Sequence, residues 1–213
     1  MRTLALALLL FGAGTTGAAS ASGDAGRSWQ FSVLLDDSPI GYHRFELSAR
    51  ESGLEVRSEA SFDVRILFIN AFRYRHSNRE LWDGECLRVI ESSTQQNGEE
   101  FAVSGARLAD GMAIQANGRS GRLDGCVMTF AYWNPRFLEQ PRLLDPQSGE
   151  YLHVEVKPLG REELTVRGES VMASAYQVKA RDLDITVYYS EDDEWLGLQS
   201  VAKGGRIIRY VLT

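Results

Sequence analysis

The sequence contains few of the residues on which metal sites, disulfide scaffolds and proline-rich chains depend. Its 213 residues include two cysteines, three histidines and five prolines. Two cysteines are too few for a disulfide-scaffolded miniprotein, and neither the cysteines nor the histidines show the spacing of a zinc site. The hydrophobic fraction of 44% excludes a disordered, collagen-like or coiled-coil chain. We therefore expect an ordinary globular protein with no metal and no cofactor.

The sequence also lacks an excess of positive charge and the short motifs of common active sites. The net charge is −6 and the isoelectric point is near 5.2, so we expect no nucleic-acid partner. No G-x-S-x-G elbow, H-E-x-x-H helix, phosphate-binding glycine loop or calcium-loop pattern is present. Enzymatic activity stays open, with the balance of the sequence against it.

Long hydrophobic runs are absent, and one short run lies near the start of the chain. Arg2 precedes the apolar stretch Leu4–Phe11, and an A-x-A pattern ends at Ala21. This pattern predicts a signal peptide over residues 1–21, cleaved after Ala21, and a single exported domain over residues 22–213. Read as structure instead, the stretch would form a short helix or anchor, because it is less than half as long as a membrane span. We expect a periplasmic or secreted protein that does not span a membrane.

Export changes the interpretation of the two cysteines. In an oxidising compartment Cys86 and Cys126 are expected to bond to each other. Such a bridge closes a loop of about 40 residues and stabilises the fold by roughly 4 kcal/mol in the chain-entropy model. The alternative is a reactive thiol pair, which lacks the C-x-x-C spacing that lowers a thiol pKa.

Apolar residues recur at every second position through most of the chain, which is the period of a half-buried β-strand. Short turns such as Asp83-Gly84 and Asn97-Gly98 separate the first runs, so neighbouring strands are antiparallel. The expected strands before the middle of the chain cover residues 29–35, 40–49, 54–63, 72–82, 86–94, 100–108 and 112–117. Alternation resumes from Leu152 to Leu212.

The middle of the chain, residues 132–149, interrupts this alternation and contains three of the five prolines. Asn134 followed by Pro135 indicates a helix cap and first turn, which Pro141 soon limits. Because each strand pair adds twist, a sheet this long curls. We predict a mainly β fold: a single curled antiparallel sheet or nearly closed barrel of about eleven strands, with one short helical excursion.

One predicted strand, residues 72–82, mixes aromatic and polar side chains. One of its faces consists of Phe72, Tyr74, His76, Asn78, Glu80 and Trp82. If this face points inward, the three polar residues are costly to bury unless they are hydrogen-bonded to each other or to the polar head of a ligand. If the strand end is exposed, they lie in water, and the sequence favours this second arrangement. The last five residues of the face are candidate ligand-binding residues, since aromatic walls with a few polar groups are typical of small-molecule sites.

Two further segments carry candidate roles. The aromatic pair of the sequence Tyr132-Trp133-Asn134-Pro135 either plugs the core or lines the mouth of a pocket, and Trp133 and Asn134 are candidate ligand-binding residues. The apolar segment Ile66, Leu67, Phe68 and Ile69 is either tucked into the core or serves as a mobile lid or a contact patch for a partner protein.

Three motifs resemble an uncharacterised family of exported bacterial proteins, classed only as a domain of unknown function. They are Glu80-x-Trp82-Asp83-Gly84-x-x-Leu87, Tyr132-Trp133-Asn134-Pro135, and Trp195-Leu196-Gly197-Leu198 with Lys203-Gly204-Gly205-Arg206 and Tyr210. The resemblance covers essentially the whole mature chain. It implies a curled antiparallel sheet of the kind found in periplasmic proteins, more distantly of the lipoprotein-carrier type, and it brings no catalytic residues with it.

Three functions follow as hypotheses. The first is a binding module that holds a lipid or other apolar small molecule in the curl of the sheet. The second is an enzyme, such as a hydrolase, using His76 and Glu80 as acid and base, although residues four apart on a strand are roughly 13 Å apart. The third is an envelope interaction or assembly protein without a ligand, contacting its partner through Ile66–Ile69. We favour the binding module.

Overall fold

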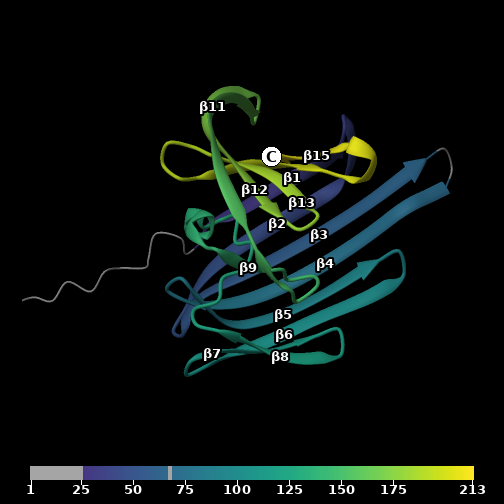
Figure 1. The fold of residues 1–213 in the computed structure, drawn as a ribbon. Coiled ribbons are helices and arrows are strands. Elements are labelled where there is room, and N and C mark those ends of the chain that lie inside the picture. The colour runs from purple at the N-terminus through teal and green to yellow at the C-terminus, as the bar shows by residue number, and fades with distance from the viewer. Residues whose placement is uncertain (1–25, 67–68) are drawn as a thin grey trace, which may run out of the picture.

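Thirteen antiparallel strands form one large sheet (Figure 1). The structure, a computed structural model, describes residues 26–66 and 69–213, in which fifteen strands supply most of the regular structure. The mainly β, antiparallel fold predicted from the sequence is therefore confirmed. The predicted signal peptide, residues 1–21, lies outside the described residues.

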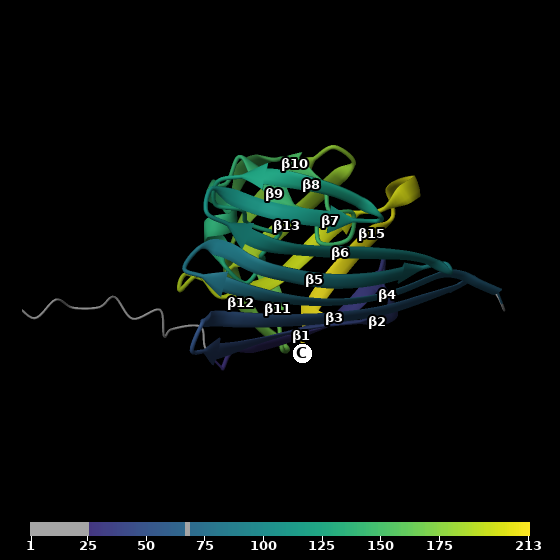
Figure 2. The same ribbon diagram turned by 90° about the horizontal axis from the view of Figure 1, so that it is seen from below.

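The sheet has two wings that meet where β1 pairs with β15. The first wing comprises β1 (Ser28–Leu35), β2 (Ser38–Arg50), β3 (Gly53–Ile66), β4 (Ile69–Asp83), β5 (Cys86–Gln96), β6 (Glu99–Leu108), β7 (Gly111–Ala116) and β8 (Arg119–Asp124). The second comprises β11 (Glu155–Val166), β12 (Glu169–Ala180), β13 (Leu183–Tyr189), β14 (Trp195–Val201) and β15 (Ile207–Leu212). In the view from below, the two wings face each other across a curled sheet (Figure 2).

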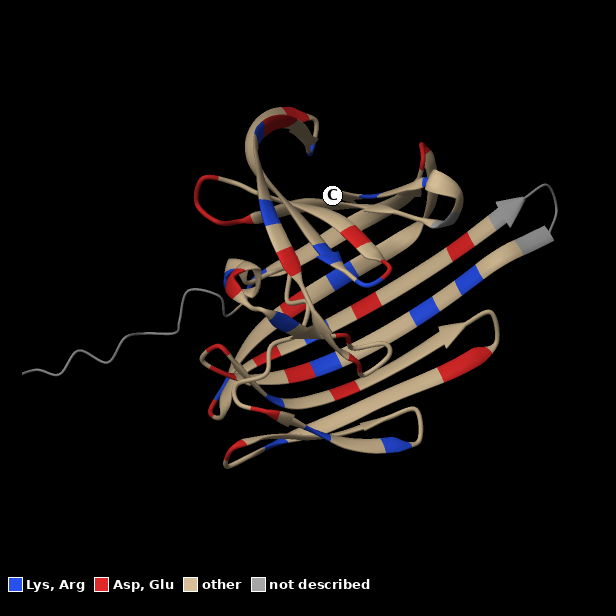
Figure 3. Cartoon of the chain, viewed as in Figure 1, with Lys and Arg blue, Asp and Glu red and all other residues tan. Residues whose placement is uncertain are grey.

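The sheet curls without closing, because β8 and β11 are its two ends. Both end strands are mostly exposed and carry charged side chains (Figure 3). Charge on an edge strand opposes edge-to-edge pairing with another molecule. The predicted number of about eleven strands is too low. The sequence prediction omitted β8, whose six residues include one apolar side chain, Leu123, and so show no alternation.

The segment between the two wings, residues 125–154, lies against the concave face of the sheet and holds the small second sheet formed by β9 (Arg142–Leu144) and β10 (Tyr151–His153). It also holds the predicted helical excursion, which is a single 3-10 helix, η1 (Pro135–Glu139). Asn134 caps this helix, since its side chain accepts a hydrogen bond of 3.1 Å from the Arg136 amide. A second 3-10 turn, η2 (Lys203–Gly205), joins β14 to β15.

The hydrophobic core lies between the concave face and this segment. Its largest fully buried side chains from the sheet include Trp82, Trp195, Tyr189 and Phe31, and the segment contributes Phe137, Met128, Leu143 and Leu144. The rings of Trp82 and Trp133 meet edge to face with centroids 5.5 Å apart. Residues 125–154, called the inner segment below, are therefore the inner layer of a two-layer structure rather than a surface loop.

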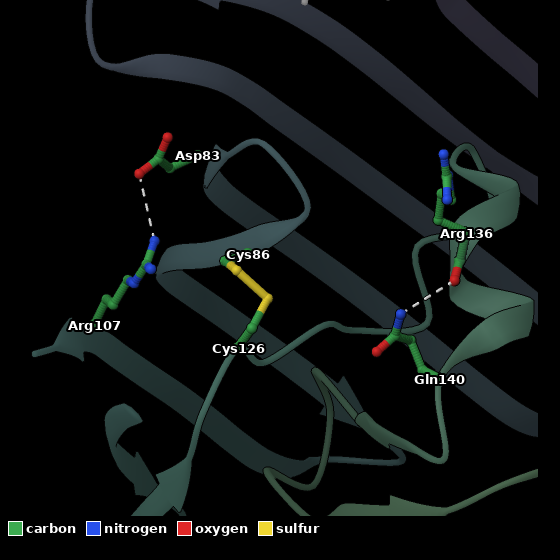
Figure 4. Close-up of a disulfide and its surroundings, with 6 residues drawn as sticks. All are labelled: Asp83, Cys86, Arg107, Cys126, Arg136 and Gln140. Carbon is green, nitrogen blue, oxygen red and sulfur yellow. Dashed lines mark hydrogen bonds and ion pairs between the residues drawn. A yellow bond between two sulfur atoms is a disulfide. The ribbon is translucent and has the colours of Figure 1, made fainter. Parts of the chain in front are cut away.

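A disulfide joins this segment to the sheet, as the sequence predicts (Figure 4). Cys86, at the start of β5, is bonded to Cys126, just after β8, with Cα atoms 5.1 Å apart. Next to the bridge, the Leu87 amide donates a hydrogen bond of 2.9 Å to the carbonyl of Val127. Neither cysteine is free, so the alternative of a reactive thiol pair is wrong.

The hairpin of β3 and β4 extends beyond the neighbouring strands (Figure 1). The pairing of β2 with β3 ends at Phe62, and the pairing of β5 with β4 ends at Tyr74. Leu67 and Phe68 lie outside the described residues, and the roles predicted for Ile66–Ile69 stay predictions. Within residues 26–66 and 69–213, no helix is long and apolar enough to cross a membrane.

Candidate functional site

A cavity of about 460 Å³ lies on the concave side of the sheet, between strands β2 to β4 and the inner segment. Residues 129–133 of that segment form one wall. A second part of the segment, within residues 145–150, also belongs to the lining and is called the covering loop below. The turn between β12 and β13, Leu152 of β10 and Tyr210 of β15 complete the lining.

The cavity exists because β3 carries small residues where its neighbours carry large ones. Ser58 lies in register between Phe45 of β2 and Asn78 of β4. Ala60, also on the inner face, is in register with His43 and His76 on the same two strands. Adjacent strands are about 4.8 Å apart, so the large side chains flank a shallow space above β3.

The aromatic and polar face of β4 points inward. His76 is 6% exposed, Glu80 is 3% exposed and Trp82 is completely buried. The prediction that the end of this strand is exposed to water is therefore wrong for His76 and Glu80. Tyr74, His76, Asn78 and Glu80 all line the cavity, whereas Trp82 lies in the core beside it. Their role in binding stays a prediction.

Glu80 is the centre of a buried hydrogen-bond network. Its two carboxyl oxygens accept bonds of 2.9 Å each from Asn78 Nδ2 and Trp82 Nε1. Burial raises the pKa of Glu80, while hydrogen bonds from Asn78, Trp82 and Thr129 oppose the rise. The carboxyl group thus satisfies donors that would otherwise be unpaired in the core, which is a structural role.

Two neutral histidines lie on either side of Ala60. His76 Nδ1 is 2.8 Å from Thr94 Oγ1, and His43 Nδ1 is 3.3 Å from the hydroxyl of Tyr210. Burial lowers the pKa of His43 to about 3 and that of His76 to about 4. Both rings are consequently uncharged at neutral pH, and they offer hydrogen bonds to the cavity without bringing a positive charge.

The covering loop is held from both sides. On the sheet side, the hydroxyl of Tyr74 donates a bond of 3.1 Å to Gln147 Oε1. On the other side, Arg181 in the β12–β13 turn donates bonds of 2.8 and 2.6 Å to the two carboxylate oxygens of Glu150. Within the loop, the Asp145 side chain accepts bonds from the Gln147 amide and the Ser148 hydroxyl. These contacts fix the loop over the cavity.

Of the two remaining candidates, one lines the cavity and one does not. Trp133 is 3% exposed and belongs to the lining, so it both packs in the core and faces the cavity. Asn134 is the cap of η1 and is not part of the lining. Sequence reasoning missed His43, Tyr210 and Asp145. For His43 the signal was present, since the two-residue period places it on the same face as Phe45.

The site does not form an acid-base pair between His76 and Glu80. Each side chain is engaged by a different partner: His76 by Thr94, and Glu80 by Asn78 and Trp82. In the described part of the chain, no group of three or more His, Cys, Asp or Glu residues is placed to hold a metal ion. The arrangement offers a space with aromatic walls, uncharged hydrogen-bonding groups such as His43, His76 and Asn78, and several carboxyl side chains.

The curled sheet and its interior space define a β-barrel-like protein with an open sheet. The chain belongs to the family described as Domain of unknown function (DUF6134), whose model matches residues 31–213. This is in agreement with the resemblance of its three motifs to an uncharacterised family.

A similar fold occurs in a crystal structure described as a beta-barrel-like protein of Domain of Unknown Function DUF1849 from Brucella abortus. The TM-score is 0.64 at 9% sequence identity, over 87% of this chain and 94% of the other. At this identity the likeness shows the fold alone. Among curated proteins, none matches this chain.

Replacing Glu80 by leucine should lower the free energy of unfolding by about 3 kcal/mol, because it leaves buried donors of Asn78, Trp82 and Thr129 without an acceptor. Glu80→Gln keeps one acceptor oxygen and should cost about 1 kcal/mol. Urea unfolding followed by tryptophan fluorescence measures both. Equal stability of Glu80→Leu and the unmodified protein would contradict the structural role of this carboxyl group.

Proposed function

We propose that this protein is a binding module that holds a lipid or other apolar small molecule in the curl of its sheet. The observation that carries the proposal is the cavity of about 460 Å³ between the concave face and the inner segment. Small-molecule sites have volumes of about 300–1,000 Å³ and mostly apolar walls with a few placed polar groups. Tyr74, Tyr132, Trp133 and Tyr210 supply aromatic wall area, and His76 supplies a polar group.

We further propose that the protein works in the periplasm or outside the cell. The predicted signal peptide over residues 1–21 supports this location. The disulfide between Cys86 and Cys126 supports it independently, because such bonds persist in oxidising compartments.

The test is a search for bound molecules in protein purified without denaturation from its native compartment. Organic extraction and mass spectrometry should find an apolar molecule in near-stoichiometric amount. Ser58→Phe, which fills the space above β3, should reduce its amount at least about tenfold, since the cavity then has no room for the ligand. Ser58→Thr, which adds one methyl group and keeps the hydroxyl, is the matched control and should retain the molecule.

Circular dichroism shows whether both variants fold, so that loss of the ligand is not confused with loss of structure. If no apolar molecule is present in the unmodified protein, or if Ser58→Phe carries as much as Ser58→Thr, the proposal fails. An assembly protein that contacts its partner through Ile66–Ile69 without a ligand would give the first of these results, because its function does not use the cavity.

A further inference from the structure

Asn78 lines the cavity, and the acceptor oxygen of its side chain is buried beside it without a partner among the described residues. Asn78 Nδ2 donates to Glu80 Oε1, which fixes the orientation of the amide group and leaves Oδ1 for another partner. Buried carbonyl oxygens are seldom left unpaired, because each one weakens folding or binding by a factor of about ten. A ligand group that donates a hydrogen bond would satisfy it.

His43 provides a second unpaired atom in the same lining. Its Nδ1 faces the Tyr210 hydroxyl, while its Nε2 is buried and has no partner within the described part of the chain. Because the ring is neutral, Nε2 is either a single donor or a single acceptor. The ring therefore suits an uncharged polar group and gives no charge with which to pair an anion.

The charges that line the cavity exclude an anionic head group. Four carboxyl side chains belong to the lining: Glu80, Asp145, Glu150 and Asp182. Arg181 is the one Lys or Arg side chain among the described lining residues, and its Nη1 already contacts both carboxylate oxygens of Glu150. A buried carboxylate or phosphate would therefore lose its hydration without gaining a free cation as partner.

We infer that the ligand is an amphiphile whose polar group donates a hydrogen bond to Asn78 Oδ1 and carries no negative charge, such as a long-chain alcohol. This inference rests on the proposed binding of an apolar molecule in the cavity. It distinguishes the ligand from fatty acids and anionic phospholipids, whose head groups meet carboxylates here, and from ethers and hydrocarbons, which leave Asn78 unpaired.

Three compounds with the same ten-carbon chain test the head group: decan-1-ol, decyl methyl ether and decanoate. Isothermal titration calorimetry at pH 8, where decanoate is ionised, measures the affinity of the full protein for each. Decan-1-ol should bind at least about tenfold more tightly than the ether, which has no donor, and more tightly than decanoate. Asn78→Leu should bind the alcohol and the ether equally. Ser77→Ala, on the opposite, exposed face of β4, should keep the difference.

The outcomes separate this inference from the proposed function. Binding of none of the three compounds, together with extracts that contain no apolar molecule, overturns both and indicates a cavity that holds only water. Equal binding of alcohol and ether, tighter binding of decanoate, or a preference that survives in Asn78→Leu overturns the head-group inference alone. If Asn78→Leu does not fold, the comparison of the three compounds on the unmodified protein decides the inference.

Discussion

Replacing both Cys86 and Cys126 by alanine is expected to lower the free energy of unfolding by about 4 kcal/mol. The bridge spans a sequence separation of 40 residues. Without it, the unfolded chain has more conformational entropy, so folding costs more free energy. The bridge also holds the start of the inner segment against β5, so its loss should loosen residues 129–133, which form one wall of the cavity. Urea unfolding followed by tryptophan fluorescence measures the change.

The unmodified protein in the presence of a reducing agent serves as the control, and it should approach the stability of the double variant. The double variant should in turn show no further change when reductant is added. A double variant within about 0.5 kcal/mol of the oxidised protein would mean that core packing alone fixes the inner segment, contrary to the role assigned to the disulfide.

Acidification from pH 7 to pH 5 is expected to remove about 4 kcal/mol of stability through His43 and His76. An unfolded histidine takes up a proton below about pH 6.5, whereas the folded protein keeps the pKa of His43 near 3 and that of His76 near 4. At pH values between the folded and the unfolded pKa, the unfolded state binds more protons than the folded state, so the free energy of unfolding falls as the pH falls. At pH 5 each ring is about 1.5 pH units below its unfolded pKa and contributes about 2 kcal/mol. Glu80, whose pKa is raised, acts in the opposite direction.

Unfolding midpoints at the two pH values, for the unmodified protein and for single glutamine variants, isolate the histidine contribution. His43→Gln and His76→Gln should each reduce the loss of stability on acidification by about half. His153→Gln is the matched control, because His153 is an exposed histidine outside the cavity lining. Identical pH dependence in all four proteins would show that the two inner histidines are not buried in their neutral form.

The sequence predicts those strands whose two faces meet different surroundings. In β1, buried residues alternate with exposed or partly exposed ones, and both β1 and β4 were predicted within a few residues of their bounds. The edge strands β8 and β11 are mostly exposed on both faces, so the two-residue period fails there. Strand β9 consists of Arg142–Leu144, and three residues next to a proline are too short to show any period.

The candidate site follows the same division. The inner face of β4 could be predicted because its five candidates belong to one strand, and alternation fixes their common side. His43 and Tyr210 lie close together although 167 residues separate them, and no local pattern relates them. The covering loop could not be predicted either. Its place over the cavity depends on tertiary contacts, such as those of Arg181 with Glu150, rather than on a repeating pattern.

The junction between the two wings has a consequence for the order of folding. Strand β15 lies between β14 and β1, and Thr213 donates a hydrogen bond to Gln30, 183 residues earlier. Both wings consist of hairpins between neighbouring strands, which close short loops and form rapidly. The middle of the sheet pairs the most distant parts of the chain, so it should form late. Until β15 is in place, β1 and β14 each present an unpaired edge. These two edges, which lie at the centre of the finished sheet, are then the parts of the partly folded chain most prone to aggregation.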